Sequence, residues 1–183
     1  AYLLLAWFYV LFALPQPVVN WANENNITIV AEGRQELLER CLDAGVEVRY
    51  RYIMRYCTKG RFWFDNCGDN LVEVRSVRYD PLKESYTAQY DRHGDDIDPV
   101  ILNITSRSEA YKILTTIPFV ELEEISEGRN KNGQDRDYLG VRIISDCRGS
   151  IGSSLLDISN LLTFGMIKIN RFDSGWIAFY LNN

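Results

Sequence analysis

The stretch VEVRYRYIMRY, residues 46–56, alternates apolar and charged side chains with a period of two. All six even positions are apolar, and four of the five odd positions are charged, with Ile53 as the exception. A helix repeats its apolar positions about every 3.6 residues, whereas successive side chains of a strand point to opposite faces. The stretch therefore predicts a long strand whose tyrosines face a core.

The charged positions of this strand include Arg49, Arg51 and Arg55, and two interpretations of them are open. Exposed positions of an antiparallel strand are polar as a rule, which favours the hydrated side of a sheet. Alternatively the three arginines form a local anion site, because a guanidinium group recognises carboxylate and phosphate through a planar fork. They are the candidate binding residues of this sequence.

The segments beside this strand predict a helix and a hairpin. Four apolar residues upstream recur at helical spacing, namely Leu37, Leu38, Cys41 and Leu42. Gly45 ends this short helix. Downstream, residues 71–79 and 85–91 each have a strand-like pattern, and Pro81 lies in the turn between them. These two segments are expected to form an antiparallel pair.

A second helix begins at a capping box formed by Ser106 and Glu109. Its apolar stripe is Ala110, Ile113, Leu114 and Ile117, and Pro118 ends it. Further strands are expected at 27–31, 100–104, 119–125, 138–147, 164–169 and 175–181, while 148–162 is a loop or a short helix. Because strands and helices do not alternate regularly, the fold class is mainly β (α+β), an antiparallel sheet or sandwich with two or three short helices.

Length and charge limit the function classes. The 183 residues are enough for one core, and residues 27–183 are expected to form a single antiparallel β-rich domain. The formal net charge is -5, whereas nucleic-acid binders usually carry a dominant basic face. A nucleic-acid partner is therefore not expected.

The N-terminal residues 1–22 are expected to be a signal peptide or an N-terminal membrane anchor. Thirteen apolar residues run from Tyr2 to Leu14 and stop at Pro15. As a helix they would cover about 20 Å, less than the ~30 Å hydrocarbon core, which favours the apolar region of a signal peptide. A membrane tether through residues 2–14 and an N-terminal core helix are the alternatives.

Cysteine usage agrees with export, because four cysteines make an even count. Three pairings are possible. Cys57 and Cys67 flank a short loop, so a disulfide between them is the first expectation, whereas Cys41 and Cys147 lie on apolar faces and are expected to be buried thiols. The spacing contains no C-x-x-C, and His93 is the only histidine, so neither a metal site nor a cofactor is predicted.

Carboxylates are the remaining candidates for chemistry. The sequence has no phosphate-binding glycine loop and no nucleophile motif, and His93 is expected in an exposed turn. Glycosidases use two carboxyl groups across a cleft, for which Asp91, Glu121, Glu123 and Glu124 are the candidates. The crowded residues Asp91, Asp95, Asp96 and Asp98, and also Asp65 with Asp69, are expected to be solvated rather than to bind calcium, because their spacing does not match an EF-hand.

Five stretches in a fixed order resemble a bacterial family, the domain of unknown function 4390. They are LLERCLDAGVEVRYRY, VRYDPLKESYTAQY, SRSEAYKIL, YLGVRI and FDSGWIAFYL, and they span residues 37–181. The chain departs from the family in its extra cysteines and in GSSLLDISN, which stands where a proline-bearing stretch usually precedes the last strands. The resemblance implies an exported protein, often encoded beside a sensor kinase linked to nitrogen control, and it brings no catalytic residues.

The expected function is an uncharacterised exported binding or interaction module of the cell envelope, without catalysis, acting through its β surface. Its partner would be a protein or an anionic ligand, and its location periplasmic or otherwise extracytoplasmic, with anchoring to the inner membrane as an option. The alternatives are a carboxylate-dependent hydrolase or carbohydrate-active enzyme, and a lipid carrier, which would need an enclosed apolar cavity.

Overall fold

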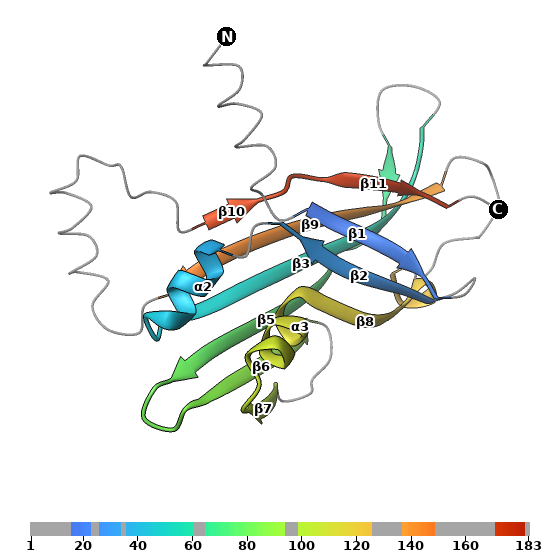
Figure 1. Ribbon diagram of the computed structural model, residues 1–183. Coiled ribbons are helices and arrows are strands. Elements are labelled where there is room, and N and C mark those ends of the chain that lie inside the picture. Colours follow the sequence, from blue (N-terminus) through green and yellow to red (C-terminus); the bar gives the residue numbers. More distant parts are fainter. Residues whose placement is uncertain are drawn as a thin grey trace, which may run out of the picture.

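Two antiparallel sheets build the protein, as the computed structural model in Figure 1 shows. The structure describes residues 16–22, 26–33, 36–60, 65–93, 99–125, 137–148 and 171–181. The larger sheet contains β3 (Glu47–Thr58), β4 (Asn66–Cys67), β5 (Leu71–Asp80), β6 (Ser85–His93), β7 (Val100–Ile104), β9 (Asp137–Arg148), β10 (Arg171–Asp173) and β11 (Ile177–Tyr180). The smaller sheet contains β1 (Gln16–Trp21), β2 (Asn26–Glu32) and β8 (Thr116–Glu121), and the helices are α2 (Glu36–Asp43), α3 (Arg107–Thr115) and α4 (Leu122–Ile125). The predicted fold class is confirmed.

Strand β3 is the centre of the larger sheet. It pairs with β9 along its whole length and with β5 from Val48 to Met54. Its even positions Val48, Tyr50, Tyr52, Met54 and Tyr56 are all buried, which confirms the predicted orientation of the tyrosines. Six of its strands follow the order β10-β9-β3-β5-β6-β7, and β11 continues along the same edge of β9 as β10 (Figure 1).

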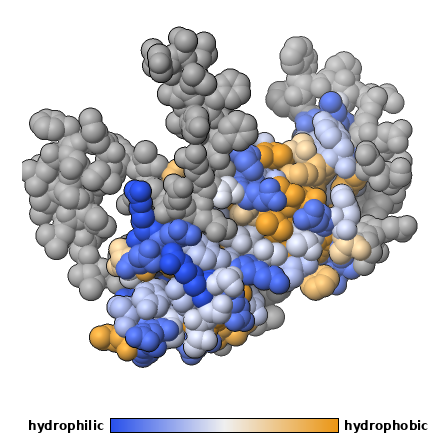
Figure 2. Space-filling model, in the orientation of Figure 1, coloured by the Kyte–Doolittle hydropathy of each residue, from blue (hydrophilic) through white to orange (hydrophobic). Residues whose placement is uncertain are grey.

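The core lies between the inner face of the larger sheet, which carries the tyrosines, and a layer made by the smaller sheet with α2 and α3. The buried side chains of this second layer include Ile27, Ile29, Leu42, Ala110, Leu114, Ile117 and Val120. Burying each branched aliphatic side chain contributes about 1.5–3 kcal/mol, so this contact is the main source of stability. Figure 2 shows apolar side chains on the surface where β1 and β2 lie in Figure 1.

Helix α3 begins where the sequence predicts and ends earlier. The Ser106 side chain accepts a hydrogen bond from the Glu109 backbone N–H at 3.4 Å. The helix stops at Thr115, because Ile117 is paired with Ile29 in the smaller sheet. The helical assignment of Ile117 was therefore wrong.

Strand β8, in turn, starts before the predicted segment 119–125 and ends at Glu121. Pro118 lies in it and is exposed, as an edge strand permits. Residues 122–125 form the short helix α4 instead of the end of a strand. The segments 148–162 and 164–169 lie outside the described residues, apart from Arg148 at the end of β9.

Part of the segment predicted as a leader or anchor forms a strand of the smaller sheet. Residues Gln16–Trp21, which the sequence analysis assigned to a leader or anchor, form β1 and pair with β2 over six positions. The apolar run 2–14 lies outside the described residues. Within the described ranges, no helix has the length and apolar composition needed to cross a membrane.

Two disulfides cross-link the domain, one over a short loop and one between distant parts of the chain. Cys57 on β3 and Cys67 on β4 are joined, the pairing that the sequence placed first. Cys41 on α2 and Cys147 on β9 are also joined, across a sequence separation of 106 residues. The expectation of buried thiols at these two positions was wrong, because the inner face of β9 brings Cys147 beside α2.

Candidate functional site

The arginine row, defined as Arg49, Arg51 and Arg55, lies on the outer face of β3, away from the tyrosines. All three side chains are half-buried rather than fully hydrated. Arginine stems lie along a sheet and cover their neighbours, which explains this partial burial. Arg49 forms an ion pair with Glu47 at 3.0 Å on the same strand, so part of its charge is balanced.

Arg51 lies among apolar side chains. Its cross-strand neighbours are Ile144 on β9 and Val74 on β5. Ile53, the next outer-face residue of β3, is paired with Val72 on β5. In the described part of the chain the Arg51 guanidinium makes no ion pair or hydrogen bond. An unbalanced cation beside an apolar surface can attract an anion more strongly than one surrounded by water.

Arg55 is held against an aromatic ring. Its guanidinium carbon lies 3.9 Å from the centre of the Trp176 ring, which is a close cation–π contact. Gly140 leaves room for this contact: a Cβ there would crowd it, at 3.3 Å from Arg55 Cγ and 3.4 Å from Trp176 Cε3. The Arg55 Nε is buried and has no hydrogen-bond partner among the described residues.

A turn between β10 and β11 sets the position of Trp176. Gly175 has a φ of 68°, a left-handed conformation that favours glycine. Its N–H donates to Asp173 Oδ1 at 2.9 Å, and the Ser174 hydroxyl accepts from Ile143 N at 2.9 Å. Arg142 donates to both oxygens of Asp173, and this hydrogen bonding raises the pKa of Arg142.

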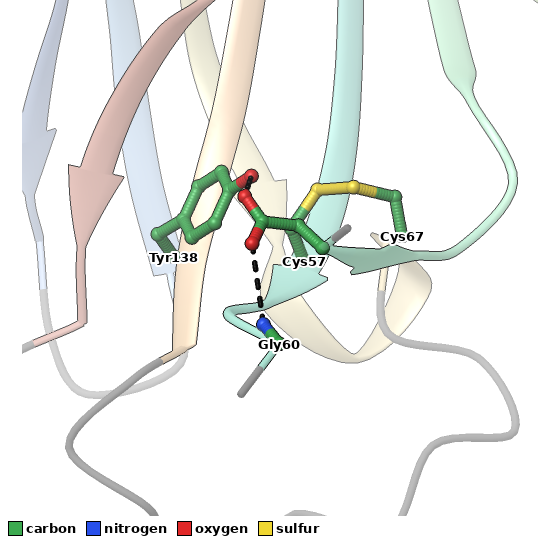
Figure 3. The surroundings of a disulfide bond; sticks show 5 residues. Cys57, Gly60, Cys67 and Tyr138 are labelled. Carbon is green, nitrogen blue, oxygen red and sulfur yellow. Dashed lines mark hydrogen bonds between the residues drawn. A yellow bond between two sulfur atoms is a disulfide. The ribbon is translucent and has the colours of Figure 1, made fainter. Parts of the chain in front are cut away.

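The end of the sheet that carries the Cys57–Cys67 disulfide holds a polar cluster (Figure 3). The Tyr138 hydroxyl donates to Asp65 at 2.7 Å, and the Gly60 N–H donates to the same carboxylate at 3.2 Å. The bond from Tyr138 is the main cause of the lowered pKa of Asp65, and the charge of Arg55 adds a smaller contribution. The Tyr138 ring also contacts Tyr180, with centroids 5.8 Å apart.

The carboxylates proposed for hydrolysis are not collected on one face. Arg92 points to the inner side of β6 and ion-pairs with Glu124 of α4 at 3.1 Å. Its chain neighbour Asp91 therefore points to the outer face, since side chains alternate along a strand. Glu121 is exposed at the end of β8, and Glu123 lies in α4. Asp91 and the α4 carboxylates thus lie on opposite faces of the sheet and do not border one cleft.

The acidic clusters do not form a metal site where they are described. Among the described residues no group of three histidine, cysteine or acidic side chains could hold a metal ion. Asp65 is instead occupied by Tyr138 and Gly60, and Asp95, Asp96 and Asp98 lie outside the described ranges. His93 is the last residue of β6, paired with Val72, rather than part of a turn.

Trp176 and Gly140 belong to this site although neither was predicted from the sequence. A signal for Trp176 was present, because Asp-Ser-Gly directly before a tryptophan is typical of a tight turn that presents the ring. No local signal marks Gly140, since its role depends on the pairing of Arg55 with Gly140 across two strands. Comparison with protein families, with curated proteins and with solved structures finds no match to this chain.

Proposed function

We propose that this protein is an exported, non-catalytic binding module of the bacterial cell envelope that holds an anionic ligand on the outer face of its larger sheet. Export is supported by the two disulfides, which fit an oxidising compartment, and by the apolar run 2–14, which would direct the chain to the periplasm or tether it to the inner membrane. The resemblance to the domain of unknown function 4390 family supports the same location.

The observation that carries the proposal is the state of Arg51 and Arg55. Neither guanidinium forms an ion pair or a hydrogen bond with a carboxylate in the part of the chain that the structure describes, although Asp65 lies close enough to Arg55 for their charges to interact. Arg55 is oriented by Trp176, and Arg51 lies beside Ile144 and Val74. An oriented guanidinium such as that of Arg55 suits planar anions, because its fork of N–H donors is already in place before binding.

The attraction of the arginine row for an anion acts only at short range. The net charge of -5 gives the protein no long-range attraction for polyanions, so a phosphate-rich nucleic acid is not the proposed ligand. The attraction comes from a few groups at short range, and salt screens it over about 8–10 Å near physiological ionic strength. Binding is therefore expected to weaken as salt is added.

The test compares two charge-matched variants on immobilised protein exposed to an envelope fraction of the native host. The double variant Arg51→Ser/Arg55→Ser removes the two arginines that have no direct carboxylate contact, and Arg78→Ser/Lys83→Ser removes two exposed cations of the β5–β6 hairpin. We expect components that the wild type and the control retain at low salt and that the double variant releases. Equal retention by all three proteins, with equal thermal stability, contradicts the proposal.

A further inference from the structure

Strand β11 presents a row of exposed side chains beside Arg55. Trp176, Ala178 and Tyr180 occupy alternate positions, and all three are exposed, Trp176 by 37% and Tyr180 by 53%. The intervening residues Ile177 and Phe179 are half-buried, and Phe179 packs against the core. Two large rings therefore face outward on the same side, with a small residue between them.

The register connects this row to the arginine. Tyr180 lies opposite Tyr138 on β9, and Ala178 lies opposite Gly140. Gly140 in turn lies opposite Arg55 on β3. We call Tyr138, Trp176, Ala178 and Tyr180 the aromatic strip. Ala178, with Gly140 beside it, separates Trp176 at one end of the strip from Tyr138 and Tyr180 at the other. The Arg55 guanidinium lies next to the Trp176 end.

We propose that the aromatic strip and Arg55 form a binding site for an acidic glycan, a chain of pyranose rings that carry carboxylate groups. This inference rests on the proposed function and names its ligand class. The C–H face of a pyranose ring is apolar and stacks on an exposed aromatic ring, while its hydroxyl groups stay in water. A carboxylate on the same sugar then accepts paired hydrogen bonds from Arg55.

The size of the strip favours a narrow ligand over a protein surface. From Trp176 to Tyr180 the strand advances about 13 Å, and two strands are about 10 Å wide. The resulting area, about 130 Å², is far below the ~800 Å² that each partner contributes to a standard protein interface. A short oligosaccharide covers such a strip completely.

The charge balance favours a glycan over a single-stranded nucleic acid, which also stacks on aromatic rings and pairs with arginine. Nucleic acids need several cations for their closely spaced phosphates. Here one guanidinium, Arg55, adjoins the aromatic strip, the Asp65 carboxylate bound by Tyr138 offsets part of that charge, and the whole chain carries a net charge of -5. A uronic-acid glycan has a lower charge density, since each carboxylate belongs to a separate sugar ring.

The experiment measures binding of the whole protein to four probes by calorimetry and by NMR shifts of the Trp176 indole. The probes are oligogalacturonate and alginate fragments as acidic glycans, galactan fragments as neutral glycans, and poly-L-glutamate as an acidic chain without sugar rings. We expect binding to at least one acidic glycan. Tyr180→Ala should weaken it about tenfold, the upper range for one aromatic contact, whereas Phe119→Ala, which removes another exposed ring from β8, should not.

The outcomes separate this inference from the proposed function. If poly-L-glutamate binds as well as the glycans and Tyr180→Ala has no effect, the glycan site is wrong and the anion-binding function stands. If galactan fragments bind as tightly as the acidic ones, the role of Arg55 is wrong. If neither acidic glycan binds while the envelope retention still depends on Arg51 and Arg55, the ligand class is wrong. If that retention is also absent, both proposals fail.

Discussion

Glu73 and Arg75 lie two residues apart on β5, and both point into the interior, where their charges meet at 2.6 Å. Glu73 is only 1% exposed and Arg75 only 7%. Arg92 adds a second ion pair to Glu73, at 3.0 Å, and connects it to Glu124. Burial alone would lower the pKa of Arg92, but the charges and hydrogen bonds of the two glutamates outweigh burial and raise it.

This buried network ties the segment from α3 to α4 onto the larger sheet. Arg75 donates to the carbonyl oxygens of Ile113 and Thr116 at 2.8 and 2.6 Å, and Arg92 donates to that of Phe119 at 3.3 Å. The last carbonyl groups of a helix have no partner within the helix. Arg75 therefore satisfies one of these carbonyl groups at the C-terminal end of α3, that of Ile113, while Arg92 binds the backbone of β8.

Replacing Glu73 with glutamine should strongly destabilise the protein. The change keeps the size of the side chain but leaves the buried Arg75 charge without its partner, which typically costs about 3–5 kcal/mol of unfolding free energy. Urea unfolding measures the loss. Lys83→Met is the control, because the Lys83 side chain is 77% exposed and its pair with Asp80 should contribute less than about 1 kcal/mol. A loss below 1 kcal/mol for Glu73→Gln would show that the network contributes little.

The in/out pattern of β3 was predictable from its sequence, but that of β5 was not. In β3 the alternation is long and one-sided, so only one orientation buries the tyrosines. In β5, LVEVRSVRY has apolar residues on both faces, and Val72 and Val74 would locally favour the wrong one. The register opposite Tyr52 and Tyr50 places Glu73 and Arg75 inside, and only the assembled sheet fixes that register. The contact between Trp176 and Arg55 was unpredictable for the same reason, since it depends on the pairing of β11, β9 and β3.

Tyr52→Phe should cost about 1–3 kcal/mol, because it leaves a buried carbonyl group without a donor. The Tyr52 hydroxyl donates to the Leu114 carbonyl oxygen at 2.9 Å, across 62 positions of the sequence. Urea unfolding at neutral pH measures the change. Tyr86→Phe is the matched control: Tyr86 is half-buried on the inner side of the neighbouring hairpin, and in the described part of the chain its hydroxyl makes no hydrogen bond. Equal stability of the two variants would contradict the role of this bond.

The two disulfides should stabilise the protein unequally. Loop-closure entropy predicts about 3 kcal/mol for the short loop closed by Cys57–Cys67 and about 5 kcal/mol for the loop closed by Cys41–Cys147, because their sequence separations are 10 and 106 residues. The paired variants Cys57→Ala/Cys67→Ala and Cys41→Ala/Cys147→Ala are compared by thermal unfolding. We expect the larger loss of Tm for the second pair, and the reverse order would contradict the entropic explanation.

Tyr138→Phe should raise the pKa of Asp65 towards the ordinary aspartate value of about 3.9. The hydroxyl of Tyr138 is the main group that lowers this pKa, and the Gly60 N–H would remain in the variant. Since the folded pKa is below the unfolded one, the bond stabilises the fold fully above about pH 4. That contribution disappears as the pH falls through the lowered pKa, so the stability difference between wild type and variant should shrink in acid.

A carboxyl-detected NMR titration of Asp65 measures this shift directly. Tyr180→Phe is the control, because it keeps the Tyr138–Tyr180 ring contact and the bond from Tyr138 to Asp65. The control should titrate like the wild type. An unchanged pKa of Asp65 in Tyr138→Phe would mean that the Gly60 N–H and the neighbouring cations Lys59 and Arg55 lower it without the phenol. In that case Tyr138 would be held in the aromatic strip by its ring contacts alone, and the phenol would be free to donate to a ligand.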